Sequence, residues 1–332
     1  MPLPCINSSL VGKLMFQISV AQLFEDNRAR LGLAWVTQPS ATPALIRRDT
    51  QDSAALVGHI NLIHPNRLQV LGAPEAARLT QGNADGAKLI AELLAPSPAI
   101  VIVGDDAQAD GGLIQAASHA SVALLRSTAS SALVIDTLRR YFARKLAETT
   151  SLHGVCMDVL GLGVLITGES GVGKSELALE LISRGHGLVA DDVVEISHIG
   201  LGTLEARCPP MLKDFLEVRG LGMLNIRTIF GETAVRPRMR LRLVVNLLRP
   251  SQTQNFETER LPLHELSEDI LGVTVRKVVI PVAAGRNLAV LLEAAVRNYI
   301  LQLRGIHSTA EFVQRQQEVL QGNAMTKRRD GQ

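Results

Sequence analysis

The feature that most constrains the fold of this 332-residue chain is a glycine-rich segment, GESGVGKS, at residues 168–175. It matches the phosphate-loop pattern G-x-x-x-x-G-K-[ST]. A short apolar run, 162–167, precedes it, and a segment with one apolar face, 175–184, follows it up to Gly185. Strand, loop and helix in this order bring backbone N–H groups and the positive end of a helix dipole to bound phosphates. The pattern therefore predicts nucleotide binding within an α/β fold, and the alternative is a glycine-rich turn that binds nothing.

Within this segment, Lys174 is expected to reach the outer phosphates, and the Ser175 hydroxyl is expected to ligate Mg²⁺, which prefers oxygen. The predicted nucleotide-binding residues are Gly168, Glu169, Ser170, Gly171, Val172, Gly173, Lys174 and Ser175.

Composition argues against several classes of partner. Aromatic residues make up only 3% of the chain, so few side chains can stack on the bases of single-stranded nucleic acid. The net charge of +2 is too small to indicate nucleic-acid or membrane binding. No apolar run reaches the roughly 18 residues of a membrane span, and no signal peptide is apparent. The three cysteines are widely spaced, which fits a reducing cytoplasm.

The order of apolar patterns predicts two domains. Strand-like and helix-like segments alternate before residue 130, which indicates a small α/β domain. An amphipathic helix is expected at 130–149, and the domain junction is placed inside it, so that the domains span 1–139 and 140–332. Asp105 and Asp106 follow the strand-like run AIVIV. A solvated turn is favoured for them over metal ligation, because no other ligand is in view.

A β-hairpin is expected immediately before the phosphate loop. The strand-like segments 151–159 and 162–167 are separated by a glycine-rich turn. This hairpin would bring His153 or Asp158 near the phosphates, although a lone histidine is more often structural.

Two adjacent carboxylates, Asp191 and Asp192, fall in the middle of the next expected strand, 187–196. Burying them among valines is costly unless a cation or a chemical task compensates. Because neighbouring residues of a strand point to opposite faces, one carboxylate is expected to address Mg²⁺ and the other the incoming nucleophile. The alternative is a solvated pair at a frayed strand end.

Three further segments carry candidate residues. In LEVRGLGMLNI, residues 216–226, Glu217 is a candidate metal ligand and Arg219 a candidate phosphate ligand, or the segment is an ordinary turn. Alternating arginines at 236–242 predict a strand with one basic face, either solvated, in a subunit contact or facing an acidic partner. Gly285 and Arg286 precede an expected helix that starts near 288, where a second anion site is conceivable.

Taken together, these motifs resemble the HPr kinase/phosphorylase family, bacterial enzymes that act on a serine of the phosphocarrier protein HPr. The resembling stretches are HGVCMDVLGLGVLITGESGVGKSELALELISRGHGLVADDVVEI, LEVRGLGMLNIRTIFG and VVIPVAAGRNLAVLLEAAVRNY. They follow the family's order over most of residues 150–305, and the first domain resembles the family mainly at NRLQVLG.

The resemblance implies two α/β domains, the second a phosphate-loop kinase domain with a mixed sheet. It implies ATP and Mg²⁺ as cofactors, HPr as protein substrate, removal of the phosphate by phosphorolysis with release of pyrophosphate, and a cytoplasmic homohexamer. Asp192 would take the proton of the substrate serine and return it in the reverse direction. Ser175 and Glu217 would hold Mg²⁺, His153 matches the family's catalytic histidine, and Arg260 matches an arginine of a mobile loop.

The resemblance also assigns a wider catalytic region. Its members are Asp191, Leu216, Val218, Arg219, Gly220, Leu221, Gly222, Met223, Leu224, Asn225, Pro281, Val282, Ala283, Ala284, Gly285 and Arg286. Residues 281–286 match the segment associated with dephosphorylation. This chain departs from the family pattern at Leu261-Pro262 and at VAA, residues 282–284.

Two other functions use the same loop. A small-molecule kinase or a GTPase-like switch is one, although the chain has no N-K-x-D guanine motif. A regulator that binds an acidic partner through the basic strand is the other. No H-R-D or D-F-G motif is present, so the chain does not resemble a eukaryotic-type protein kinase.

Overall fold

The structure is a computed structural model, and it describes residues 17–37, 45–47, 56–61, 65–79, 84–249 and 265–329. The chain divides into two compact units, Met1–Ala147 and Glu148–Gln332. The amphipathic helix α5 (Ser131–Lys145) lies wholly in the first unit, so the junction predicted near residue 140 falls inside this helix. Within the described residues, no helix combines the length and apolar character needed to cross a membrane.

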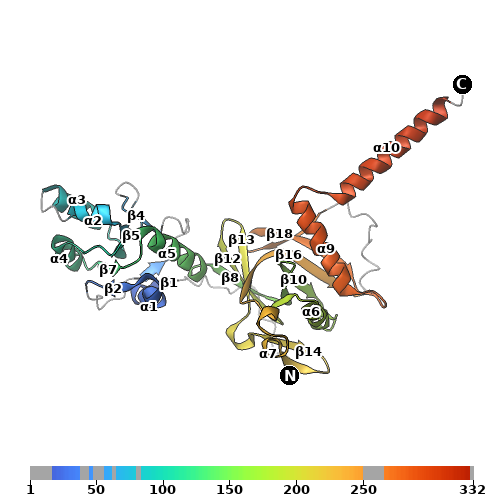
Figure 1. Cartoon of the computed structure of the whole chain (residues 1–332), viewed down its shortest axis with the longest axis horizontal. Coiled ribbons are helices and arrows are strands. Elements are labelled where there is room, and N and C mark those ends of the chain that lie inside the picture. Colours follow the sequence, from blue (N-terminus) through green and yellow to red (C-terminus); the bar gives the residue numbers. More distant parts are fainter. Residues whose placement is uncertain are drawn as a thin grey trace, which may run out of the picture. The chain divides into compact units, whose positions relative to one another are not determined.

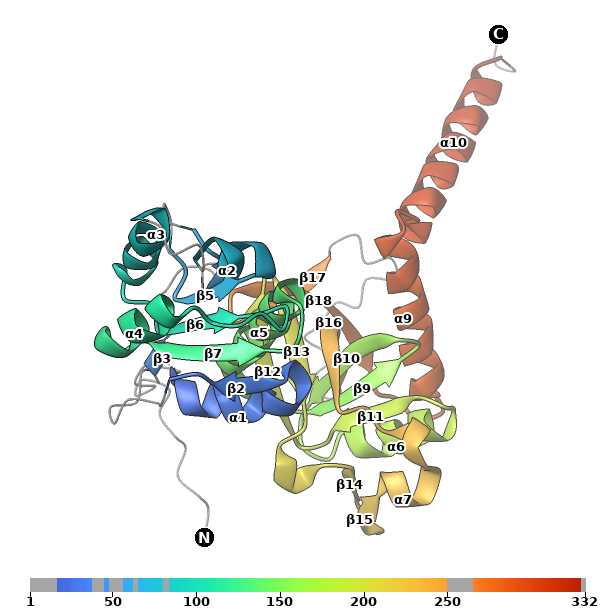
Figure 2. The same cartoon turned by 60° about the vertical axis from the view of Figure 1, so that its left-hand side comes forward.

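The first unit is the α/β domain that the alternating pattern predicted (Figure 2). Its sheet has the order β2-β7-β6-β5-β4, in which β4 to β7 are parallel and β2 is an antiparallel edge. Helices α1 and α5 pack on one face, and α2, α3 and α4 on the other. Its elements are β1 (Gln17–Ser19), α1 (Val20–Leu31), β2 (Leu33–Trp35), β3 (Leu45–Arg47), β4 (Val57–His59), β5 (Leu68–Leu71), α2 (Ala73–Leu79), α3 (Ala84–Leu94), β6 (Ile100–Val103), α4 (Gly111–His119), β7 (Ala123–Ser127) and α5.

Asp105 and Asp106 occupy a turn after β6, as predicted, but both carboxylates have partners within the domain. The two oxygens of Asp105 accept hydrogen bonds from the backbone N–H groups of Ala73 (2.8 Å) and Ser131 (2.7 Å) at the starts of α2 and α5. These bonds lower the pKa of Asp105. Asp106 forms an ion pair with Arg126. Asp105 therefore stabilises the fold, whereas Asp106 stays mostly exposed, as expected of a solvated turn.

The second unit is built on a nine-stranded mixed sheet, which confirms the predicted fold class (Figure 1). Strand β16 is long enough to pair with β13 near its start and with β10 and β18 further on. The elements of this unit are β8 (Glu148–His153), β9 (Val155–Val159), β10 (Leu162–Gly168), α6 (Lys174–Ser183), β11 (Gly187–Ala190), β12 (Val193–Gly200), β13 (Thr203–Arg207), η2 (Pro210–Leu212), β14 (Phe215–Val218), β15 (Gly222–Asn225), α7 (Ile226–Phe230), η3 (Glu232–Ala234), β16 (Arg238–Leu248), β17 (Leu266–Ile270), β18 (Val273–Pro281), α9 (Leu288–Leu303) and α10 (Ser308–Arg329).

Two apolar cores hold this sheet in place. Helices α6 and α9 pack on one face of β9, β10, β16 and β18, and strands β12 and β13 enclose a second core on the other side. Because β10, β16 and β18 are parallel, their carboxyl ends share one edge of the sheet. That edge therefore gathers the phosphate loop, Arg249 and the segment 281–286.

Several predicted elements are shorter than expected. The strand predicted at 151–159 is interrupted at Gly154, where a Cβ atom would lie 2.6 Å from the carbonyl oxygen of Ile166. The strand predicted at 187–196 is interrupted at Asp191 and Asp192, and the helix predicted at 130–149 ends at Lys145.

The basic strand is confirmed as β16, and two of the four arginines at 236–242 have carboxylate partners. Arg236, just before β16, pairs with Asp158 at 2.8 Å, and Arg238 pairs with Glu205 at 3.5 Å. Asp158 also accepts a hydrogen bond from the N–H of Gly161 in the hairpin turn, so it stabilises the hairpin. Part of the basic face therefore serves internal ion pairs.

A buried contact between His186 and Glu293 joins the far end of α6 to α9, and we expect it to make stability depend on pH. His186 Nε2 lies 2.9 Å from Glu293 Oε1, and this bond, followed by that of Arg297, lowers the pKa of Glu293. A carboxyl group with a lowered pKa contributes stability above its unfolded pKa and loses it as the pH falls through the folded value. Glu293→Gln should therefore lower the Tm at pH 7 by about 2–6 °C.

Calorimetry between pH 7 and pH 3 tests this expectation. The difference in Tm between the wild type and Glu293→Gln should persist down to about pH 4.5 and shrink below it. Glu311→Gln is the matched control, because Glu311 is exposed and pairs with Arg315 within α10. A difference that stays constant down to pH 3 would contradict the role given to Glu293.

Candidate active site

The phosphate loop connects β10 to α6, in the strand-loop-helix order that the sequence predicted. The Lys174 ammonium group is 7% exposed and donates hydrogen bonds to the carbonyl oxygens of Gly168 and Glu169, both at 3.0 Å. An ammonium group has three donors, so one direction is left for a phosphate oxygen. Lys174 therefore stabilises the conformation of the loop through two backbone carbonyl groups, and its positive charge faces the space above the loop.

Asp191 connects the phosphate loop to the hairpin formed by β14 and β15. Its Oδ1 accepts a hydrogen bond from the Ser175 hydroxyl at 3.3 Å, and its Oδ2 accepts one from the backbone N–H of Glu217 at 2.9 Å. The side chain is 6% exposed, and burial raises its pKa. The donors of both hydrogen bonds are neutral, so the carboxylate adds negative charge to this site.

Asp192 forms an ion pair with His153, with 3.0 Å between Asp192 Oδ1 and His153 Nδ1. Antiparallel pairing of β8 with β12 sets this distance, because His153 lies opposite Val193 in the register. Both side chains are more than half exposed. An exposed carboxylate held by an imidazole is able to accept a proton from an arriving hydroxyl group.

The two aspartates were expected to point to opposite faces of one strand, and this expectation was wrong. They lie in the break between β11 and β12, and Asp192 has a positive φ of 65°. The alternation of a regular strand does not apply there, so both side chains line the same cavity.

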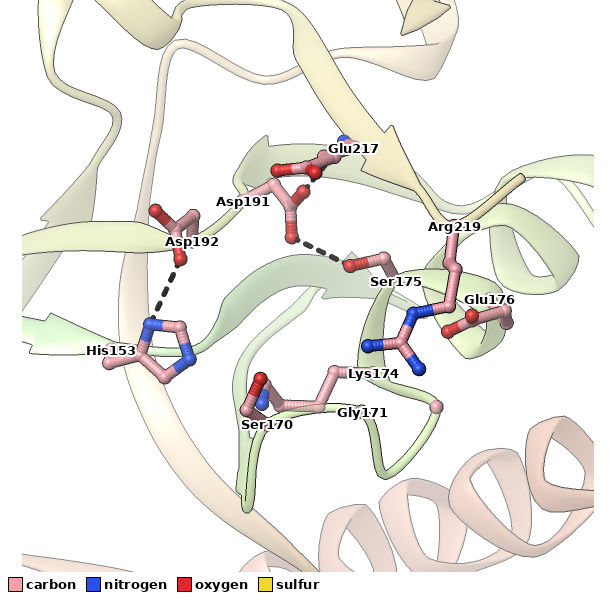
Figure 3. Close-up of a pocket in the computed structure, with 11 residues that line it drawn as sticks. His153, Ser170, Gly171, Lys174, Ser175, Glu176, Asp191, Asp192, Glu217 and Arg219 are labelled. Atoms are coloured by element: carbon pink, nitrogen blue, oxygen red, sulfur yellow. Dashed lines mark hydrogen bonds and ion pairs between the residues drawn. The ribbon is translucent and has the colours of Figure 1, made fainter. Parts of the chain in front are cut away.

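Figure 3 shows this cavity above the phosphate loop, and its volume is about 160 Å³. Side chains from β8, the loop, the break before β12 and the β14–β15 hairpin converge on it. Ten predicted residues line it: His153, Ser170, Gly171, Gly173, Lys174, Ser175, Asp191, Asp192, Glu217 and Arg219. The predicted acidic and basic side chains therefore line the same cavity.

Other predicted residues lie outside the cavity wall. Val172, Leu216 and Val218 are buried in the core against α6, and Asn225 caps α7 with its side chain. The segment 216–226 is therefore a hairpin rather than an irregular loop. The remaining predicted residues that do not line the cavity are Gly168, Glu169, Gly220, Leu221, Gly222, Met223, Leu224, Pro281, Val282, Ala283, Ala284, Gly285 and Arg286. Arg260 lies outside the described residues.

The sequence analysis missed two residues at this site. Glu176 lines the cavity from the first turn of α6, next to Ser175, and its position directly after the motif was a signal. Arg249 follows β16 and bonds to the phosphate loop. No local pattern marks Arg249, because the pairing of β16 with β10 brings it there.

The donors in the cavity fit a magnesium ion together with a nucleotide. The Ser175 hydroxyl and the Glu217 and Asp191 carboxylates are hard oxygen donors, and the buried charge of Asp191 favours a cation. Among the described residues, no group of three His, Cys, Asp or Glu side chains is arranged to hold a metal alone. Mg²⁺ usually needs only one or two protein carboxylates, because phosphates and waters supply its other ligands.

Comparison with known proteins gives matches over most of the chain. Residues 144–316 match the family model described as HPr Serine kinase C-terminal domain, and residues 18–142 match HPr Serine kinase N terminus. The chain belongs to the HPr kinase/phosphorylase family. It is 55% identical over 316 residues to the HPr kinase/phosphorylase of Nitrosomonas europaea, covering 93% of this chain and 97% of that protein.

Further relatives of the HPr kinase/phosphorylase family were found. The HPr kinase/phosphorylase of Aromatoleum aromaticum is 55% identical over 311 residues, covering 93% of this chain and 98% of that protein. A solved structure of the Hpr(Ser) kinase/phosphatase from Coxiella burnetii matches with 36% identity and a TM-score of 0.44, covering 49% of this chain and 98% of that one. Membership in a family of kinases implies the use of a nucleotide.

Proposed function

We propose that this protein transfers the γ-phosphoryl group of ATP to a serine of HPr, with Mg²⁺, and removes it again by phosphorolysis. The observation that carries the proposal is the shared cavity of Asp192 and the phosphate loop, in which a candidate base faces the site for the phosphates. The family relationship supports the identity of the protein substrate. ATP, Mg²⁺, a cytoplasmic location and a homohexamer are parts of this proposal.

In the forward reaction, Asp192 accepts the proton of the serine hydroxyl as its oxygen attacks the γ-phosphorus and the bond to ADP breaks. His153 holds the Asp192 carboxylate in place. Lys174 and Arg219 present positive charge to the transferred group from two sides of the cavity. Ser175 and Glu217 would hold Mg²⁺, with Asp191 behind them as the hydrogen-bond partner of both. The bound ion would supply charge neutralisation at the phosphate oxygens.

In the reverse reaction, inorganic phosphate attacks the phosphorus of phosphoserine and forms pyrophosphate. The bond from phosphorus to the serine oxygen breaks, and protonated Asp192 returns the proton to that oxygen. Inorganic phosphate then occupies the part of the cavity that holds the terminal phosphates of ATP in the forward reaction. One site with one acid-base group is therefore sufficient for both directions.

Labelled phosphate tests the proposal. The purified chain is incubated with Mg²⁺, ATP labelled at the γ-phosphate and HPr, and the expected result is label on HPr. HPr with its target serine replaced by alanine is the control. Inorganic phosphate added after removal of ATP should then release the label as pyrophosphate.

Two outcomes would overturn the proposal. Label on a small molecule, with none on HPr, would indicate a small-molecule kinase. Nucleotide binding with no transfer to any acceptor would indicate a regulatory protein.

A further inference from the structure

Arg249 contacts the phosphate loop from outside the cavity. It directly follows β16, and the parallel pairing of β16 with β10 places Leu247 opposite Gly168, where the loop begins. Ser170 and Gly171 line the cavity, whereas Arg249 is not among the described residues that do. Arg249 therefore binds loop residues that line the cavity without lining it itself.

The guanidinium group contacts two consecutive loop residues and lies close to a third. Its Nη2 donates a hydrogen bond to the carbonyl oxygen of Ser170, and its Nε lies 3.3 Å from Glu169 Oε2. The same Nη2 lies 3.4 Å from the position that a Cβ atom on Gly171 would occupy. The guanidinium group is planar and its N–H groups have fixed directions, so it binds the Ser170 carbonyl and the Glu169 carboxylate at once. The ammonium group of a lysine is a compact point charge and lacks this fixed geometry.

The contact with Ser170 determines the direction of an N–H group. The carbonyl of Ser170 and the N–H of Gly171 belong to one peptide group, and the described chain has no cis peptide bond. In a planar trans peptide, C=O and N–H point in opposite directions. A donor that holds the Ser170 carbonyl therefore directs the Gly171 N–H away from Arg249, and both loop residues line the cavity.

We propose that Arg249 is a positioning residue for phosphoryl transfer, which aims the N–H of Gly171 at the phosphate oxygens. This inference rests on the proposed function and adds a residue to it. Glu169 assists by holding the guanidinium group through its carboxylate. Gly171 has a φ of 72°, and the Arg219 Nη atoms lie 3.6 Å from its Cβ position, so glycine suits this place.

Arg249→Met, Arg249→Lys and Glu169→Gln in the full chain test this role. In Arg249→Met, the Gly171 N–H should no longer be oriented toward the reacting phosphate. The kcat/KM for ATP should therefore fall by about tenfold to hundredfold. Arg249→Lys and Glu169→Gln should lose less. Arg242→Met is the matched control, because Arg242 is an exposed arginine of the same strand, and its activity should equal that of the wild type.

Rescue by free guanidinium ions separates positioning from a purely structural role. Guanidinium chloride at millimolar concentration should restore part of the activity of Arg249→Met and none of that of Asp192→Asn. With an active wild type, an Arg249→Met variant within about twofold of its kcat/KM would overturn the inference, since one oriented donor typically contributes more. A loss that follows a fall in Tm and resists rescue would overturn it too. An inactive wild type would instead refute the proposed function.

Discussion

Asp192→Asn is expected to lower the rate of phosphoryl transfer from ATP to HPr at least about hundredfold, because a positioned base contributes about 10² to 10⁴ in rate. The amide keeps the shape of the side chain but cannot accept the proton of the serine hydroxyl. ATP binding should be nearly unchanged, because Asp192 lies beside His153 and not within the phosphate loop. Single-turnover transfer of labelled phosphate and calorimetric titration with ATP measure the two effects separately.

Glu195→Gln provides the matched control. Glu195 is a carboxylate on β12, the strand that follows Asp192, and it pairs with Arg207 at 2.8 Å on the neighbouring strand. Its rate should equal that of the wild type. If Asp192→Asn kept the wild-type rate, Asp192 would not be the base, and the assignment of the proton step would have to be abandoned.

The sequence predicted most of the site because its main parts are local. The phosphate loop is a contiguous motif, and its flanking apolar runs indicated β10 and α6 correctly. The hairpin of β9 and β10 also followed from two short apolar runs and a glycine-rich turn. His153 was expected on this hairpin, but it ends β8, and the pairing of β8 with β12 brings it to the site. The chemical roles of these residues stay predictions, since they depend on the reaction and not on geometry alone.

The errors and omissions arise from features that hydropathy does not encode. The apolar residues around Asp191 and Asp192 continue across the pair, so the pattern indicated one strand where a positive φ at Asp192 breaks it. Arg249 is separated from the loop by 79 positions in the sequence, and only the parallel register of β16 and β10 joins them. Contacts between such distant positions can be identified only once the pairing of the strands is known.

Asp191→Asn is expected to abolish most activity and to raise thermal stability at the same time. Asp191 orients the Ser175 hydroxyl and the Glu217 backbone, so its loss should reduce phosphoryl transfer by about tenfold to hundredfold, as for outer partners of metal ligands. The buried carboxylate has only neutral hydrogen-bond donors, and burying a charge in that way is costly. Removing the charge should therefore raise the Tm of the protein without nucleotide by about 2–4 °C.

Asp158→Asn distinguishes this explanation from a general effect of removing a buried carboxylate. Asp158 is 9% exposed, close to the 6% of Asp191, but it pairs with the Arg236 guanidinium at 2.8 Å. Its replacement leaves the half-buried Arg236 guanidinium without its carboxylate partner, so the Tm should fall while phosphoryl transfer stays at the wild-type level. If Asp191 serves function at a cost in stability, the Tm should rise in Asp191→Asn and fall in Asp158→Asn. A fall in Tm for both variants would show that Asp191 stabilises the fold, and the cation would no longer be needed to explain its burial.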